Sequence, residues 1–165
     1  MRASILLSIV VLLLLAPARA EDESWKEYKN ARFGFLLKYP PGLVASRAPD
    51  NGGGQEYHSQ DKEFSVAAFA HFLVDGDSLD QQWAGELKEL GDTVTYKKKT
   101  GDWYVISGVA RDGTEYYHKF FASGANFAGF QITYPHAKNK KYDPWVERIA
   151  KGFAPFLKGD YDRIK

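Results

Sequence analysis

The chain has 165 residues, a formal net charge of +1, no cysteine, 44% hydrophobic residues and 15% aromatic residues. The length suits a single folded domain, and the apolar fraction is too high for an intrinsically disordered chain. The lack of cysteine excludes disulfides, thiolate metal sites, a cysteine nucleophile and a lipid-modified N-terminal cysteine.

The first 20 residues are typical of a secretory signal peptide. A positive start precedes an apolar run over Ile5–Leu15, and Ala18-Arg19-Ala20 supplies the small residues of a cleavage site. The run is shorter than the roughly 20 apolar residues of a membrane-spanning helix; an uncleaved anchor is the alternative. Cleavage removes two of 22 basic residues and none of 21 acids, which leaves a charge of −1 and argues against a general nucleic-acid-binding protein. We expect a periplasmic or secreted protein with one domain over residues 21–165.

The first half of that domain predicts three strands. Phe33–Tyr39 is apolar and ends at two prolines, which cannot donate to a β-ladder. Residues 46–56, with three successive glycines, predict a flexible loop. Tyr57–Ser59 and Glu63–Phe72 predict two further strands, and the second is apolar on both faces, as in a strand covered on both sides.

A capped helix is predicted next. Ser78 is a suitable N-cap, Gln81 completes a capping box, and Gly91 is suited to end the helix in a left-handed conformation. Spacings of four, four and three place the apolar residues on one stripe, formed by Leu79, Trp83, Leu87 and Leu90.

The most regular part of the chain is a series of four β-rich segments. They are Val94–Lys98, Trp103–Val109, Glu115–Ala122 and Phe127–Tyr134. Each separator contains Gly beside Asp, Asn or Ser, the residues of tight hairpins. Four strands joined by three short turns form an antiparallel meander.

A second helix is predicted after this meander. Asp143 is its expected N-cap, and Pro144 would occupy the first helical position, where a missing N–H costs nothing. The expected buried stripe consists of Val146, Ile149, Ala150 and Phe153. The order β-β-β-α-β-β-β-β-α predicts an α+β fold, an antiparallel sheet of about six to seven strands packed with two helices.

Several motifs resemble a group of exported bacterial proteins of uncharacterised function. They are Tyr28-Lys29-Asn30-Ala31-Arg32-Phe33-Gly34-Phe35 with Tyr39-Pro40, Asn51-Gly52-Gly53-Gly54-Gln55, Trp103-Tyr104-Val105-Ile106-Ser107-Gly108, and Tyr142-Asp143-Pro144 with Ile149-Ala150-Lys151-Gly152-Phe153. The opening motif and the strand order also resemble the PsbP-like fold, which an extrinsic subunit of photosystem II shares with a nuclear protein that binds a small GTPase. The resemblance implies a PsbP-like sandwich that binds other macromolecules. It implies no catalytic residue, because the fold shares no catalytic set.

The sequence predicts no metal site, no cofactor and no catalytic residue. None of the four histidines has a ligand spacing such as His-x-x-x-His. The acids of residues 75–80 depart from a calcium loop and suit a helix N-terminus instead. The glycine run leads into a strand and lacks the Gly-Lys-Ser/Thr ending of a phosphate loop, and no Gly-x-Ser-x-Gly elbow occurs.

These observations favour an exported, non-enzymatic binding or accessory protein with an unknown macromolecular partner in the cell envelope. Tyrosine gives a large contact area with a polar tip, so we expect either the aromatic face of the meander or the glycine loop near residues 50–56 to bind this partner; core packing is the competing explanation for the aromatic residues. The candidate binding residues are Tyr104, Tyr116, Tyr117, His118, Tyr134, Asn51 and Gly53.

Two other functions stay open. One is a hydrolase that uses a histidine–acid pair, such as His118 or His58 with Glu56, because histidine titrates near neutral pH. The other is an envelope assembly or stress helper without a ligand pocket.

Overall fold

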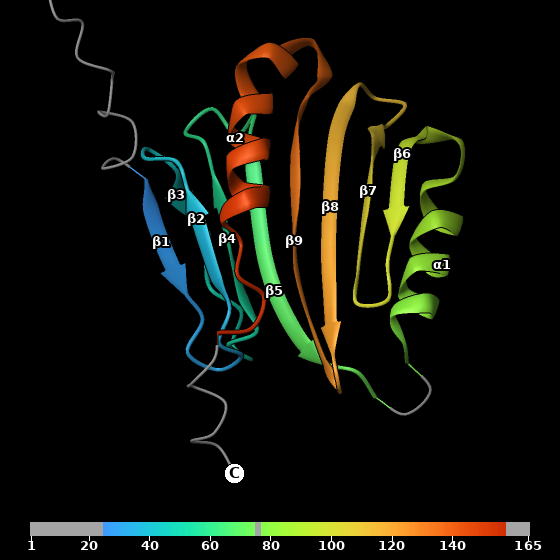
Figure 1. Ribbon diagram of the computed structural model, residues 1–165. Coiled ribbons are helices and arrows are strands. Elements are labelled where there is room, and N and C mark those ends of the chain that lie inside the picture. Colours follow the sequence, from blue (N-terminus) through green and yellow to red (C-terminus); the bar gives the residue numbers. More distant parts are fainter. Residues whose placement is uncertain (1–24, 75–76, 158–165) are drawn as a thin grey trace, which may run out of the picture.

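The computed structural model describes residues 25–74 and 77–157, so the predicted leader lies outside the described residues. Figure 1 shows the described elements, which follow one another along the chain. They are β1 (Lys26–Lys29), β2 (Leu36–Tyr39), β3 (Val44–Ala45), β4 (Gly54–His58), β5 (Ser65–Phe72), α1 (Leu79–Leu90), β6 (Val94–Lys99), β7 (Trp103–Val109), β8 (Thr114–Ser123), β9 (Asn126–Pro135) and α2 (Asn139–Gly152). Neither described helix has the length and apolar character needed to cross a membrane.

One antiparallel sheet of seven strands organises the molecule. Its order is β3-β4-β5-β9-β8-β7-β6, and β1 pairs with β2 in a separate two-stranded sheet. Figure 1 shows α2 and the β1–β2 pair in front of the sheet near β4 and β5, whereas α1 stands at the far end beside β6. The predicted α+β fold, with a large antiparallel sheet and two helices, is confirmed.

The sheet separates two hydrophobic clusters, because successive side chains of a strand point to opposite faces. On one face, β2, β5, β9 and α2 enclose the larger cluster, which includes Phe35, Phe64, Phe130 and Ile149. On the other face, the apolar stripe of α1 covers the smaller cluster over β7 and β8, which includes Tyr104, Ile106 and Phe120. We call these the α2 face and the α1 face.

The meander and the first helix agree closely with their predictions. Strands β6 to β9 pair in sequence order, and their ends differ from the predicted ends by one residue at most. The Ser78 hydroxyl accepts a hydrogen bond from the Gln81 N–H at 3.2 Å, as the capping box requires. Gly91 follows the helix with a φ of +56°, a region that glycine enters without steric cost.

The N-terminal part differs from its prediction. The strand expected over residues 33–39 starts only at Leu36, because the side chain of Asn30 holds a tight turn before it. Asn30 Oδ1 accepts the N–H groups of Arg32 (3.0 Å) and Phe33 (2.8 Å), and Gly34 follows with a φ of +66°. Strands β1 and β3 were not predicted, since β1 is short and mostly charged and β3 has only two residues.

Strand β4 begins at Gly54, three residues before the predicted strand, and shortens the expected loop. A Cβ added at Gly54 would lie 2.3 Å from the Ala68 carbonyl oxygen of β5. Only glycine therefore allows the two strands to approach this closely. The run of three glycines thus contributes to strand packing as well as to the loop.

The predicted start of the second helix is wrong. The helix begins at Asn139, directly after a short 3-10 turn, so Pro144 lies inside it rather than at its first position. Pro144 lacks the N–H that would bond the carbonyl four residues earlier, so the helix is without one backbone hydrogen bond near its N-terminus. The carboxylate of Asp143 does not cap the helix; it accepts a hydrogen bond from the Tyr134 hydroxyl at 2.9 Å.

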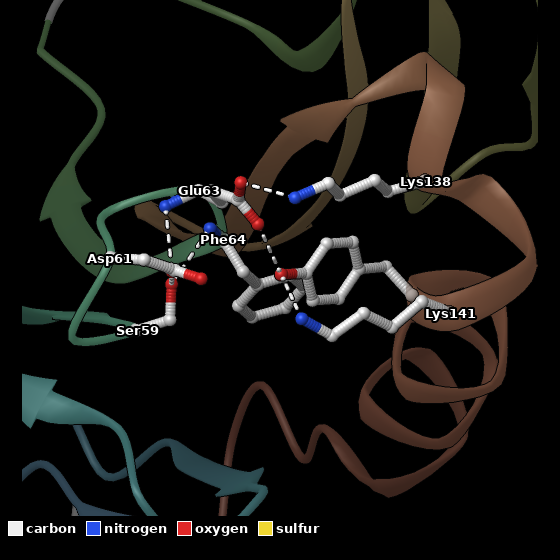
Figure 2. A network of polar contacts seen from close by, with 7 residues as sticks. Ser59, Asp61, Glu63, Phe64, Lys138 and Lys141 are labelled. Carbon is white, nitrogen blue, oxygen red and sulfur yellow. Dashed lines mark hydrogen bonds and ion pairs between the residues drawn. The ribbon is translucent and has the colours of Figure 1, made fainter.

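A polar network joins the β4–β5 turn to the start of α2 (Figure 2). Glu63 pairs with Lys138 and also accepts a hydrogen bond from the Tyr142 hydroxyl at 3.3 Å, while Lys141 donates to the same hydroxyl at 2.9 Å. Within the turn, Asp61 accepts from the Ser59 hydroxyl and from the Glu63 N–H. The drawn polar groups satisfy one another, so we interpret the network as a structural clasp between helix and sheet.

Candidate functional site

The predicted tyrosines do not share one face of the meander. Tyr104 and Tyr116 pack into the α1 face, whereas Tyr117 and Tyr134 pack into the α2 face. Tyr116 and Tyr117 are neighbours in β8, and neighbouring strand residues point in opposite directions. Tyr104, Tyr116 and Tyr134 are 2%, 4% and 3% exposed, so most of their surface contributes to packing.

A cavity of about 490 Å³ lies between α1 and the sheet. Its aromatic side consists of Phe69, Tyr104, Phe120 and Phe127, from β5, β7, β8 and β9. The helix lines the opposite side with Gln81, Gln82, Gly85, Glu86 and Glu89. We call this hollow the α1 cavity; its size falls within the range of about 300–1,000 Å³ that is usual for ligand pockets.

The α1 cavity exists because α1 covers only part of its face of the sheet. The helix packs on β7 and β8 through its apolar stripe, while Gln131 of β9 and His71 of β5 remain at the cavity wall. Gly85 contributes to the opening, since nothing lies within 4 Å of the point where its Cβ would stand. A larger side chain at position 85 would occupy part of this space, which glycine leaves open.

A second hollow of about 350 Å³ adjoins the α1 cavity. Both are lined by Phe69 and His71, so they are neighbours on one face of the sheet. Asn51 and Gly53, two of the predicted binding residues, line this second hollow, and Tyr104 lines the first. The structure therefore brings together the glycine loop and one tyrosine of the meander.

Hydrogen bonds from both side chains and backbone hold the main chain of the glycine loop in place. The Gly53 N–H donates to Asn51 Oδ1 at 2.9 Å, and the Ala70 N–H donates to the Gly53 carbonyl at 2.8 Å. The amide of Asn30 donates to the Gly52 carbonyl at 3.0 Å. Asn51 is exposed and Gly53 is buried, so the Asn51 side chain is the one of the two that a partner could contact.

The most unusual polar feature of the α1 face is a contact between Glu86 of α1 and His118 of β8. His118 Nδ1 binds Glu86 Oε1, and the two side chains are only 12% and 13% exposed. The other carboxylate oxygen, Oε2, is buried and has no hydrogen-bond partner within the described parts of the chain. A charged group at the edge of a hydrophobic cluster is costly unless it is paired, so this contact fixes α1 against the sheet.

Tyr104 lies next to this pair and remains protonated at neutral pH. Burial raises the pKa of the Tyr104 hydroxyl well above its usual value, and the negative charge of Glu86 raises it further. A neutral hydroxyl with a high pKa donates hydrogen bonds but is a poor nucleophile. It therefore suits recognition better than covalent chemistry.

The histidine–acid pairs considered for a hydrolase take other arrangements. His118 binds Glu86 rather than Glu56, and Glu56 contacts the hydroxyls of Ser46 and Ser65. His58 Nδ1 lies 2.9 Å from the Ser59 carbonyl oxygen. His118 is not among the residues that line the α1 cavity, and those residues include no Ser, Thr or Cys.

Metal ligands do not cluster in the described residues. No group of three or more His, Asp or Glu side chains within residues 25–74 and 77–157 is arranged to hold a metal ion. Asp75 and Gly76 of the acidic segment lie outside the described residues; Ser78, which follows them, caps α1 as expected.

Glu86 was missed at the sequence level, although a signal was present. It lies three residues after Trp83 and four before Leu90, which places it on the apolar stripe of α1. A charged residue on a buried stripe predicts a buried partner, and an imidazole in the facing sheet is a suitable one.

Comparisons with known proteins add information on the fold. No family model matches the chain, and no curated protein matches it. Among solved structures, cyanobacterial PsbP (CyanoP) from Synechocystis sp. PCC 6803 has a TM-score of 0.62 over 87% of this chain and 99% of its own, with 11% identity. The chain has a PsbP-like fold. A structure from Bacteroides thetaiotaomicron has a TM-score of 0.55 over 82% of this chain, at 16% identity.

The present chain matches different shares of the two neighbouring structures. It spans almost all of the cyanobacterial protein but only half of the Bacteroides chain. At these identities the likeness concerns the fold alone, and function has to be argued from the site.

Proposed function

We propose that this PsbP-like protein is an exported, non-enzymatic binding or accessory protein whose macromolecular partner docks over the α1 cavity. The observation that carries the proposal is the cavity itself, a space between α1 and the sheet whose lining includes Glu86, one member of a buried polar pair. Rigid aromatic walls with a few placed polar groups favour binding, because little side-chain entropy is lost when a ligand enters.

Three features support binding over catalysis. The lining offers no hydroxyl or thiol nucleophile apart from Tyr104, whose pKa is raised. His118 uses Nδ1 for Glu86 and stands outside the lining. The adjoining hollow beside the glycine loop extends the surface beyond one small molecule, as expected for a protein partner.

Gly85 provides the sharpest test of this site. A leucine at position 85 projects into the α1 cavity, and glycine is a poor helix residue, so Gly85→Leu blocks the site without weakening α1. Gly85→Ala is the matched control, because it changes the helix in the same direction and fills much less space.

The experiment is affinity capture from the envelope fraction of the source cells with residues 21–165 as bait. We expect the wild type and Gly85→Ala to retain the same partner and Gly85→Leu to lose at least nine-tenths of it. Equal capture by all three baits would remove the α1 cavity as the docking site. Absence of any reproducible partner would count against a binding function altogether.

A further inference from the structure

We propose that the α1 cavity recognises a lysine side chain of the partner, a primary ammonium on a four-carbon apolar stem. This inference rests on the proposed function and adds the chemical class of the bound group.

The charge around the α1 cavity is strongly one-sided. Three carboxylates line it, those of Asp77, Glu86 and Glu89, and none of the described lining residues is Lys or Arg. His71 is the one basic side chain in the lining, and its ring packs at 4.9 Å from that of Phe127. The whole chain is close to neutral, so this concentration of acid is local and favours a cationic ligand.

The aromatic side of the cavity fits the rest of a lysine side chain. Phe69, Tyr104 and Phe120 form a continuous set of rings, with centroids 5.4 Å and 5.3 Å apart along the set. An apolar stem packs on such rings while its charged head reaches the carboxylates. Ring faces also attract a nearby ammonium through the cation–π interaction.

The Glu86 carboxylate favours an ammonium over a guanidinium. An arginine prefers to bind both oxygens of one carboxylate in a planar fork. His118 already binds Oε1, and Oε2 is buried close to the Tyr104 hydroxyl, so the two oxygens are not both open to a fork. This carboxylate suits the compact ammonium of lysine better than a planar fork, and the three N–H groups of the ammonium can also reach other acceptors in the lining such as Gln81, Gln82 and Glu89.

The test uses the intact chain 21–165 and three matched probes. They are Nα-acetyl-lysine amide, Nα-acetyl-arginine amide and Nα-acetyl-norleucine amide, the last having the same apolar stem without the charge. Binding is followed by NMR, with the ring signals of His118 as the reporter and those of His136, which pairs with Glu115 elsewhere on the surface, as the internal control. We expect the lysine probe to bind at least tenfold more tightly than the other two and to shift His118 but not His136.

Acid-to-amide variants locate the binding. We expect Glu89→Gln and Asp77→Asn each to weaken the lysine probe by about two- to fivefold, in line with exposed ion pairs, and Gly85→Leu to abolish its binding. Glu147→Gln is the control, because Glu147 is an exposed acid of α2 whose ion pair with Lys151 lies on the other face. Thermal unfolding of each variant shows whether the fold is intact.

The outcomes separate this inference from the proposed function. Equal binding of the lysine and norleucine probes, or of the lysine and arginine probes, would overturn the lysine assignment. Loss of partner capture in Gly85→Leu, combined with no binding of the lysine probe, would leave the docking site standing without this ligand. Release of captured partner by excess lysine probe, and not by the norleucine probe, would support a lysine that belongs to the partner itself.

Discussion

The two faces of the sheet are built from the same strands but are filled very differently. The α2 face is closed by α2 and the β1–β2 pair, and Phe64, Phe130 and Ile149 are fully buried there. The α1 face has a smaller cluster, a cavity of about 490 Å³ and a buried carboxylate–imidazole contact. Packing without voids contributes most to stability, and an incompletely filled face leaves room for a ligand. We therefore expect the α2 face to contribute most of the stability, whereas the proposed docking site lies on the less completely filled α1 face.

The largest expected effect comes from opening the α2 face. Phe130→Ala removes a fully buried ring, whose centroid lies 5.0 Å from that of the Phe153 ring, and leaves a cavity behind. We expect the free energy of unfolding to fall by about 3–5 kcal/mol, measured by urea titration. Phe72→Ala serves as control, because Phe72 is 54% exposed; a loss as large as that of Phe130→Ala would contradict the contrast between core and surface.

Gly129→Ala tests how closely β8 and β9 approach on the α1 face. The added Cβ would lie 2.2 Å from Phe120 Cδ1 and 2.3 Å from the Lys119 carbonyl oxygen. Because backbone cannot move aside as easily as a flexible side chain, we expect a loss of about 1–3 kcal/mol in unfolding free energy. A variant as stable as the wild type would show that this part of the sheet adjusts freely.

Removing the imidazole from the Glu86–His118 contact tests how much this contact contributes to stability. His118→Ala leaves the buried Glu86 carboxylate without its partner, which we expect to cost about 1–3 kcal/mol of unfolding free energy. Adding Glu86→Gln to His118→Ala removes the unpaired charge and should recover part of the loss. A double variant no more stable than His118→Ala would argue against a charge-dependent contact.

Gly85→Ala is expected to stabilise the protein, in contrast to the preceding substitutions. Its Cβ meets nothing within 4 Å, and alanine is the better helix residue, so the melting temperature should rise, with a gain of about 0.5–1 kcal/mol. A decrease in melting temperature would mean that α1 packs more tightly at this point than the cavity indicates.

The smallest expected effect concerns the clasp at the β4–β5 turn. The hydrogen bond from Ser59, and then the backbone N–H of Glu63, lower the pKa of Asp61 below its usual value near 3.8. A lowered pKa in the folded state gives stability that is present above the unfolded pKa and is lost as the pH falls through the folded value. We expect Asp61→Asn to flatten the fall in melting temperature below about pH 4; an unchanged pH profile would exclude this contribution.

Much of the fold could be predicted because local signals agreed with the tertiary structure. The stripe and the Ser78 cap determine α1, and alternation with tight turns determines the meander. The start of α2 was misplaced because Asp143 followed by Pro144 has the sequence pattern of a helix start. In the structure, the Asp143 carboxylate instead accepts a hydrogen bond from the hydroxyl of Tyr134, which belongs to β9. Contacts of this kind, between distant segments, are not encoded in local patterns.

The candidate site was only partly predictable, for the same reason. Tyr104, Asn51 and Gly53 do line hollows on the α1 face, but Tyr117 and Tyr134 belong to the opposite face. Successive residues of a strand point to opposite faces, so the separation of Tyr116 from Tyr117 could have been predicted from the sequence. The pairing of Glu86 with His118 depends on how α1 sits on the sheet, which no single segment specifies.

The two rims of the large sheet limit how this protein can associate. Strand β3 has only two residues, and β6 carries three consecutive lysines, Lys97, Lys98 and Lys99. A short rim and a positively charged rim both discourage an incoming strand from extending the ladder. Both edges therefore disfavour the growth of fibrils by addition of strands from other copies of the chain.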